Sequence, residues 1–109
     1  MADWVPTAEW EPAAADEFDD AADHYDARRP GLSADLVADL KKTLEAVETR
    51  PLSFPRLLDV PDELRIRRAL LHRFPFAVVF LELPDGRLRV IAFAHARRRP
   101  GYWLSRVVP

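Results

Sequence analysis

The side chains in this sequence that could do chemistry are mostly arginines, and they are concentrated in its second half. A guanidinium group can hold a phosphate or a carboxylate through two parallel hydrogen bonds, and a histidine can act as an acid or a base near neutral pH. These residue types indicate recognition of an anionic partner. The candidate residues for binding a partner or target are Arg65, Arg67, Arg73, Arg89, His95, Arg97, Arg98 and Arg99.

Charge is unevenly distributed along the chain, although the net charge is only -2. Residues 1–49 carry a net charge of -9 and residues 50–109 a net charge of +7. The acidic half is expected to be mostly helix and the basic half mostly strand. The sheet surface could therefore attract phosphate or an acidic partner even though the whole molecule would not.

Several kinds of chemistry are disfavoured by what the sequence contains. The chain has no cysteine, which excludes disulfides and thiolate metal sites. The carboxylates of residues 19–23, with His24, fit a solvated helix face better than a set of convergent metal ligands. Phosphate-binding loops, dinucleotide fingerprints and serine nucleophile elbows are absent. We therefore expect no metal and no cofactor.

The length of 109 residues predicts a single domain over residues 1–109, with residues 1–6 as an N-terminal lead. No apolar run approaches the roughly 20 residues that a membrane span requires. The N-terminus also lacks the basic and apolar regions of a signal peptide. A cytoplasmic protein is the expectation.

A three-stranded antiparallel meander is expected to position the arginines. An arginine-rich strand over 65–74 leads into an apolar run over 76–83, which turns at 84–87 and returns over 88–94. Asp85-Gly86 between two β-rich runs is a strong hairpin signal, because glycine accepts the positive φ of a tight turn.

The alternation of side chains in the outer strands predicts one packed face and one open face. The residues expected to face the core are Ile66, Leu70, His72 and Phe74 in the first strand and Leu88, Val90, Ala92 and Ala94 in the last. The open face is expected to carry Arg65, Arg67, Arg73, Arg89 and His95 around apolar side chains. An open apolar patch rimmed by arginines is typical of a binding surface.

Two amphipathic helices are expected before the meander. The first begins at Pro12 and ends near Arg29, and the second is capped by Ser33 and ends at Arg50. A short strand over 7–11 precedes them. The predicted class is α+β: a short N-terminal strand and an antiparallel two-helix hairpin packed on one face of the meander.

Five segments together carry a resemblance to a known family. They are Glu9 to Ala14 (EWEPAA), Arg29 to Leu32 (RPGL), Arg50-Pro51 with Phe54-Pro55, Arg68 to Phe76 (RALLHRFPF) and His95 to Trp103 (HARRRPGYW). In order and spacing over residues 7–103, the chain resembles the RelE/ParE superfamily of toxins from bacterial type II toxin-antitoxin systems. The superfamily's fold agrees with the α+β class expected from the residues.

The resemblance implies a growth-inhibiting toxin of the plasmid-stabilisation type, silenced by an antitoxin whose C-terminal segment wraps it. ParE-like members poison DNA gyrase by binding, whereas RelE-like members are ribosome-dependent ribonucleases that cut messenger RNA. Ribosome-dependent enzymes tend to be basic and rich in lysine, but this chain is net acidic and its two lysines, Lys41 and Lys42, lie on the second helix. The ParE-like branch is therefore favoured.

A RelE-like ribonuclease is the alternative. RNA cleavage needs a group that takes the 2′-hydroxyl proton, a group that protonates the leaving oxygen, and cations that stabilise the phosphorane. The tentative catalytic residues for that reaction are Arg65, Arg73, His95 and Tyr102. A third alternative is a degenerate member of the superfamily that is no longer toxic.

Overall fold

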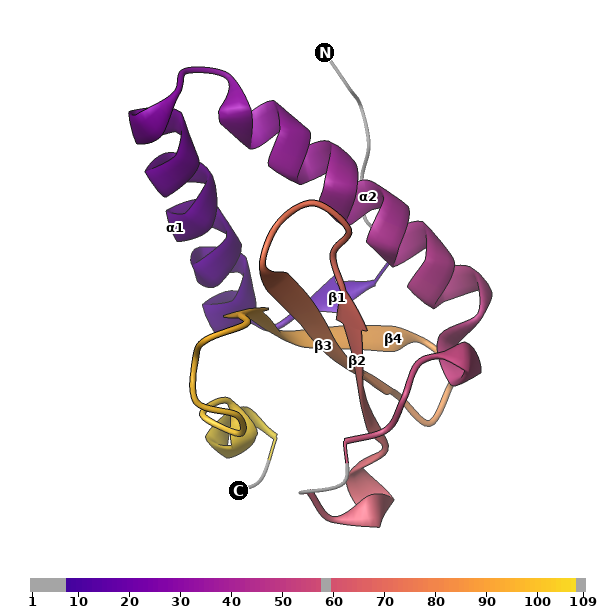
Figure 1. Ribbon diagram of the computed structural model, residues 1–109. Helices are drawn as coiled ribbons and strands as arrows, with labels where there is room; N and C mark the ends of the chain where they lie inside the picture. Colours follow the sequence, from indigo (N-terminus) through magenta and orange to yellow (C-terminus); the bar gives the residue numbers. More distant parts are fainter. Residues whose placement is uncertain (1–7, 58–59, 108–109) are drawn as a thin grey trace.

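The computed structural model describes residues 8–57 and 60–107, so the N-terminal lead and Thr7 lie outside the described residues. Two helices and four strands form two layers, and the strand order in the mixed sheet is β1-β4-β3-β2 (Figure 1). The elements are β1 (Glu9–Trp10), α1 (Pro12–Arg28), α2 (Leu32–Thr49), β2 (Ile66–Leu70), β3 (Phe76–Glu82) and β4 (Leu88–His95), with 3₁₀ turns η1 (Pro51–Ser53), η2 (Asp62–Leu64) and η3 (Leu104–Arg106). The predicted α+β class is confirmed, and β1 adds a fourth strand parallel to β4.

The helical hairpin has the predicted extent, but its second helix begins differently. Pro12 occupies the first turn of α1, and Gly31, with a φ of 89°, precedes α2. Ser33 is therefore not the cap, because it already lies inside the first turn. Its N–H and hydroxyl instead donate to the Asp26 carboxylate (2.8 and 2.7 Å), which joins the two helices.

The β3–β4 hairpin forms at the predicted turn, where Gly86 has a φ of 87°. The antiparallel register is interrupted by a β-bulge, because Val79 pairs with Ala92 whereas Phe80 pairs with Val90. Ile91 is the extra residue. An extra residue reverses the side-chain alternation beyond it.

The bulge corrects the predicted faces of β4. Leu88 and Val90 face the helices as expected. Beyond the bulge, Ala92 and Ala94 instead pack on the second face of the sheet. Phe93 turns towards the helices, where it stacks on Phe76 (4.6 Å between ring centroids) and meets Phe18 edge to face.

The predicted faces of β2 are also wrong. Ala69, not Ile66, packs in the helix-side core, and Ile66 lies on the second face. Leu70 and His72 are exposed rather than buried. Arg67 can lie on the helix side of the sheet because β2 is the last strand in the sheet order. A long side chain there can extend past the edge of the sheet.

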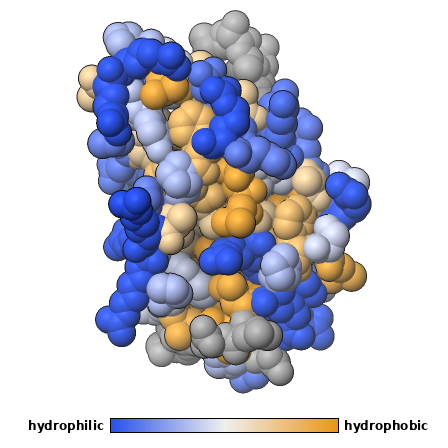
Figure 2. All heavy atoms as spheres, in the orientation of Figure 1, coloured by the Kyte–Doolittle hydropathy of each residue, from blue (hydrophilic) through white to orange (hydrophobic). Residues whose placement is uncertain are grey.

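The second face of the sheet is not open along its whole length, which is a further correction. The chain itself covers Ile66, Val79, Ile91 and Ala92 with Trp103, which is 3% exposed. The side chains that complete this second cluster are Leu57, Val60, Leu64, Leu81, Ala94, Tyr102, Leu104 and Val107. In Figure 2, hydrophobic side chains nevertheless remain visible along the middle of the face in view, between hydrophilic margins.

Candidate functional site

A groove remains on the second face of the sheet, between the segment after η1 and the C-terminal segment, and we call it the tail groove. Leu70, Ala77, Val79 and Ala94 line it from the sheet, and it has a volume of about 540 Å³. Leu70 is 59% exposed. The other lining residues are Leu57, Val60, Arg68, His95, Ala96, Arg98, Arg99, Pro100, Gly101, Tyr102, Trp103 and Leu104.

The tail groove combines apolar lining with a cationic rim. Arg68, Arg98 and Arg99 line it and are exposed. The Arg98 guanidinium lies 3.7 Å from the centroid of the Tyr102 ring, which holds that cation at the groove. Apolar lining beside arginines suits a protein segment that carries both apolar and acidic side chains.

Glu17 on α1 holds the C-terminal wall of this groove in place. Its carboxylate accepts hydrogen bonds from the Tyr102 hydroxyl (2.6 Å), the Arg106 guanidinium (2.9 and 3.1 Å) and the backbone N–H of Phe93 (3.1 Å). Burial alone would raise the pKa of Glu17, but the hydrogen bonds from Arg106, Tyr102 and Phe93 outweigh it and lower the pKa. The pKa of Tyr102 is raised, by burial and by its hydrogen bond to Glu17. Tyr102 therefore keeps its proton and anchors the tail.

Asp39 on α2 organises the turn that joins β2 to β3. Its side chain is 2% exposed, and it accepts hydrogen bonds from the backbone N–H groups of His72 (3.0 Å), Arg73 (2.7 Å) and Phe74 (3.2 Å). Burial would raise the pKa of Asp39, but these three hydrogen bonds prevail and lower it. The carboxylate therefore stays ionised and fixes the backbone beside the tail groove.

The structure does not bring all the predicted arginines together. Arg65 and Arg67 line a separate pocket beside η1. Arg73 lies in the β2–β3 turn, with its guanidinium 3.7 Å from the Asp35 carboxylate. The side chain of Arg89 is engaged by Glu9 (3.3 Å) and Glu11 (2.6 Å).

The remaining predicted residues lie at or next to the tail groove. His95 lines it together with Arg98, Arg99 and Tyr102, and Arg97 is exposed beside them. The His95 ring meets Phe76 edge to face, and its Nδ1 atom accepts a hydrogen bond from the Arg97 N–H (3.0 Å). One of the two ring nitrogens is thus occupied within the protein.

The four tentative catalytic residues do not converge on one point. Ile66, next to Arg65, pairs with Leu81. His95 pairs with Phe76, five residues away along β3. At about 3.4 Å per residue, these two ends of the sheet are about 17 Å apart. Arg65 cannot therefore contact a phosphate that His95 contacts.

Sequence reasoning missed the structural roles of Glu17, Asp39 and Arg106. Asp39 gave the clearest signal, because it occupies the apolar stripe of α2 between Leu36 and Leu40, where an ionisable residue needs a partner. Glu17 and Arg106 had no comparable signal, since they are 89 residues apart and meet only in the folded chain. Arg68, which was not among the candidate binding residues, lies at the groove rim.

The described residues contain neither a candidate metal site nor a helix that could span a membrane. No group of three or more histidine, aspartate or glutamate side chains there could hold a metal ion. Within the same residues, none of the helices is long and apolar enough to cross a membrane.

The fold matches a solved structure from a toxin-antitoxin system. A chain of the structure described as "Chromosomal ParDE TA system from P. aeruginosa" superposes with a TM-score of 0.67 at 20% sequence identity, covering 85% of this chain and 100% of that chain. Neither a protein-family model nor a curated relative matches the sequence. This chain therefore shares the fold of that chain, and the fold that the resemblance implied is confirmed.

Proposed function

We propose that this protein is the toxin of a bacterial type II toxin-antitoxin module and inhibits growth in the cytoplasm by binding a target such as DNA gyrase. A cognate antitoxin keeps it silent in a hetero-oligomeric complex. The observation that carries the proposal is the likeness of its fold to a chain of the ParDE system, which spans the whole of that chain. The partly uncovered, arginine-rimmed tail groove supports it further.

The tail groove is the proposed antitoxin site. It offers apolar lining around Leu70 and cations at Arg68, Arg98 and Arg99. An antitoxin segment with apolar side chains towards Leu70 and acidic side chains towards these arginines would complement both. Arg97, exposed beside the groove, is proposed to contribute charge.

Binding rather than RNA cleavage is proposed because the candidate catalytic groups are dispersed or engaged. Arg65 and His95 lie at opposite ends of the sheet. Tyr102 donates its hydroxyl proton to the Glu17 carboxylate in a 2.6 Å hydrogen bond. General acid–base catalysis requires its groups within hydrogen-bonding reach of one substrate.

Inducible expression with and without the neighbouring open reading frame tests the proposal. We expect the protein alone to stop growth, and the product of that reading frame to restore growth and to co-purify with the protein. Leu70→Glu should abolish co-purification, whereas Ala34→Glu, which adds the same charge on the exposed side of α2, should preserve it. A protein that is harmless alone and remains monomeric beside that partner contradicts the proposal.

The target is tested with the purified protein. We expect inhibition of DNA supercoiling by gyrase, with no ribosome-dependent cuts in a primer-extension assay. Cuts that disappear in the His95→Ala variant would instead establish the ribonuclease alternative.

A further inference from the structure

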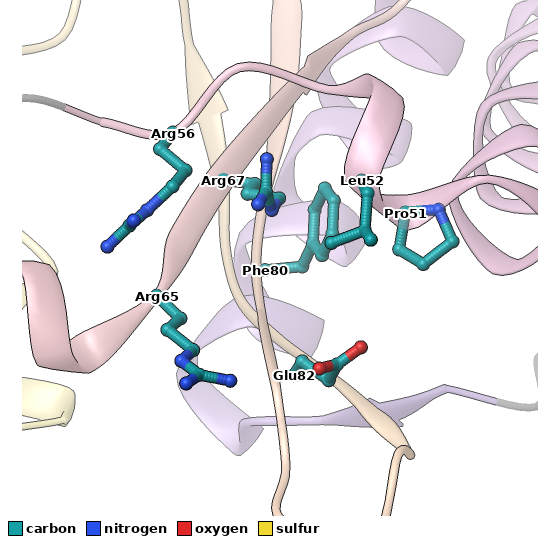
Figure 3. A pocket seen from close by; sticks show the side chains of 7 residues that line it. All are labelled: Pro51, Leu52, Arg56, Arg65, Arg67, Phe80 and Glu82. Atoms are coloured by element: carbon teal, nitrogen blue, oxygen red, sulfur yellow. The ribbon is translucent and has the colours of Figure 1, made fainter.

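A second pocket lies beside η1, at the start of β2, and we call it the Arg65 pocket. Arg65 and Arg67 contribute its cations, Pro51 and Leu52 an apolar wall, and Phe80 lines it from the core (Figure 3). Arg56 and Glu82 complete the lining, and the volume is about 200 Å³. Phe80 belongs to the helix-side core, so this pocket opens on the opposite face of the sheet from the tail groove.

The two principal cations of the Arg65 pocket retain capacity for a ligand. Arg67 uses one guanidinium nitrogen, Nη1, to donate to the carbonyl oxygen of Phe54 (2.6 Å), which aims the side chain without neutralising it. The guanidinium of Arg65 makes no ion pair or hydrogen bond with the described part of the chain. An arginine with free donors beside an apolar wall can bind an anionic group bidentately.

The backbone at Arg65 is held in an unfavourable conformation. Its φ is 51°, and it is the only non-glycine residue with positive φ among residues 8–57 and 60–107. Side chains other than glycine pay an energetic penalty there, so such residues concentrate at functional sites. The strained backbone directs a guanidinium that has no partner among the described residues into a pocket, which is an independent sign of a binding role.

The size and lining of the pocket select the chemical class of its occupant. Whole small-molecule sites commonly enclose about 300–1,000 Å³, so this pocket fits a single side chain rather than a nucleotide. The carboxylate of Glu82, beside the arginines of the lining, would repel the successive phosphates of a nucleic acid more strongly than the single carboxylate of one side chain. Leu52, 72% exposed, offers an apolar contact that a phosphate backbone would not use.

We propose that the Arg65 pocket is a second protein-docking site. It takes a glutamate or aspartate side chain of a partner between Arg65 and Arg67, and a neighbouring apolar side chain of that partner against Leu52. The described residues contain two exposed large hydrophobic side chains, Leu52 and Leu70, and each lines one of the two arginine-bearing pockets. The inference goes beyond the proposed function, because it requires neither toxicity nor occupancy of the tail groove.

The test uses the purified full chain and a short fluorescein-labelled peptide in which glutamate and leucine alternate. Fluorescence anisotropy gives the affinity, and amide chemical shifts locate the bound peptide. We expect shifts at Leu52 and Arg67, and no comparable binding of the same peptide with glutamine in place of glutamate. Loss of one charge-assisted hydrogen-bonding group corresponds to roughly tenfold weaker binding or more, so we expect Arg65→Gly and Arg67→Gln each to weaken the affinity at this site by that factor.

Arg65→Gly separates binding from folding, because glycine accepts the positive φ at this position without strain. The variant should keep or raise the melting temperature while it loses the peptide-induced amide shifts at Leu52. Arg68→Gln, which changes the tail groove instead, should leave the shifts and affinity at the Arg65 pocket unchanged. The proposal is overturned if, at the amides of the Arg65 pocket, Arg65→Gly binds the peptide with wild-type affinity or the glutamine peptide binds equally well. It is also overturned if a single-stranded RNA or duplex DNA oligonucleotide binds more tightly through the same amides.

Discussion

Replacing Asp39 by alanine should destabilise this protein more than any comparable change on the surface of α2. Asp39 accepts three backbone N–H groups from the β2–β3 turn, at 2.7–3.2 Å, and its side chain is 2% exposed. A hydrogen bond to a charged group contributes about 1.5–3 kcal/mol, so three such bonds set an upper limit of roughly 4.5–9 kcal/mol. His72 and Arg73 are exposed, so hydrogen bonds to water can partly replace those that their backbone N–H groups lose in the variant. We therefore expect a loss of about 3–4 kcal/mol in the free energy of unfolding.

The matched control for Asp39→Ala is Asp35→Ala, one turn earlier on the same helix. The side chain of Asp35 is 41% exposed, and among the described residues its ion pairs are with Arg29 (3.6 Å) and Arg73 (3.7 Å). Exposed pairs contribute about 0–1 kcal/mol, so the control should lose less than about 1 kcal/mol. Both substitutions place alanine inside α2, and at Asp35 the change also removes a carboxylate that interacts favourably with the helix dipole in the first turn.

Urea unfolding at pH 7, followed by tryptophan fluorescence and circular dichroism, measures the difference between the two variants. At about 4 °C per kcal/mol for a domain of this size, Asp39→Ala should also lower the melting temperature by roughly 12–16 °C. If the two alanine variants unfold at the same urea concentration, the three hydrogen bonds do not stabilise the turn and this reasoning is wrong.

Three further predictions concern pH, the C-terminal segment and the hairpin turn. The pKa of Asp39 is lower in the folded chain than its ordinary value of about 3.9, so its stabilising effect is present above that value and is lost as pH falls through the folded pKa. The stability gap between wild type and Asp39→Ala should therefore narrow below about pH 4 in urea titrations, and an unchanged gap at pH 2 would contradict the assignment. Glu17→Gln leaves the half-buried Arg106 without its ion pair. This variant should accelerate amide hydrogen exchange in residues 102–107 by about tenfold or more. The control Asp19→Asn, on the exposed side of α1, should leave that exchange unchanged. Gly86→Ala should cost about 1–2 kcal/mol in urea unfolding, because φ is 87° there and the surrounding space is open, so the penalty comes from the backbone alone; a neutral result would show that the turn adopts another geometry.

The faces of the sheet illustrate where prediction from the sequence stopped. Strict alternation from Arg89 would place Phe93 on the open face, but the bulge at Ile91 turns its side chain towards the helices. In β2, the arginines Arg65 and Arg67 were expected on the open face of the sheet. Because that strand lies at the sheet edge, the Arg67 side chain can lie on the helix side of the sheet and donate a hydrogen bond to the Phe54 carbonyl. Bulges and edges are properties of strand pairing, which the order of residues in one strand does not specify.

The candidate sites were predicted only in outline for the same reason. The arginine-rich composition of residues 65–99 indicated an anionic partner, but it did not separate the tail groove from the Arg65 pocket. That separation depends on which face each arginine occupies. The role of Tyr102 likewise depends on Glu17, 85 residues away along the chain.

The sequence by itself determined the class of fold, the extents of the two helices and the β3–β4 turn. Those features follow from residues that are adjacent or one helical turn apart: Pro12 at the start of α1, Pro30-Gly31 between the helices, and Asp85-Gly86 in the hairpin. Only the tertiary structure decided how much of the second sheet face is covered and where a partner can reach it. Those outcomes depend on contacts between distant segments, such as Trp103 on Ile91 and Glu17 with Arg106, whose formation requires the whole chain to be folded.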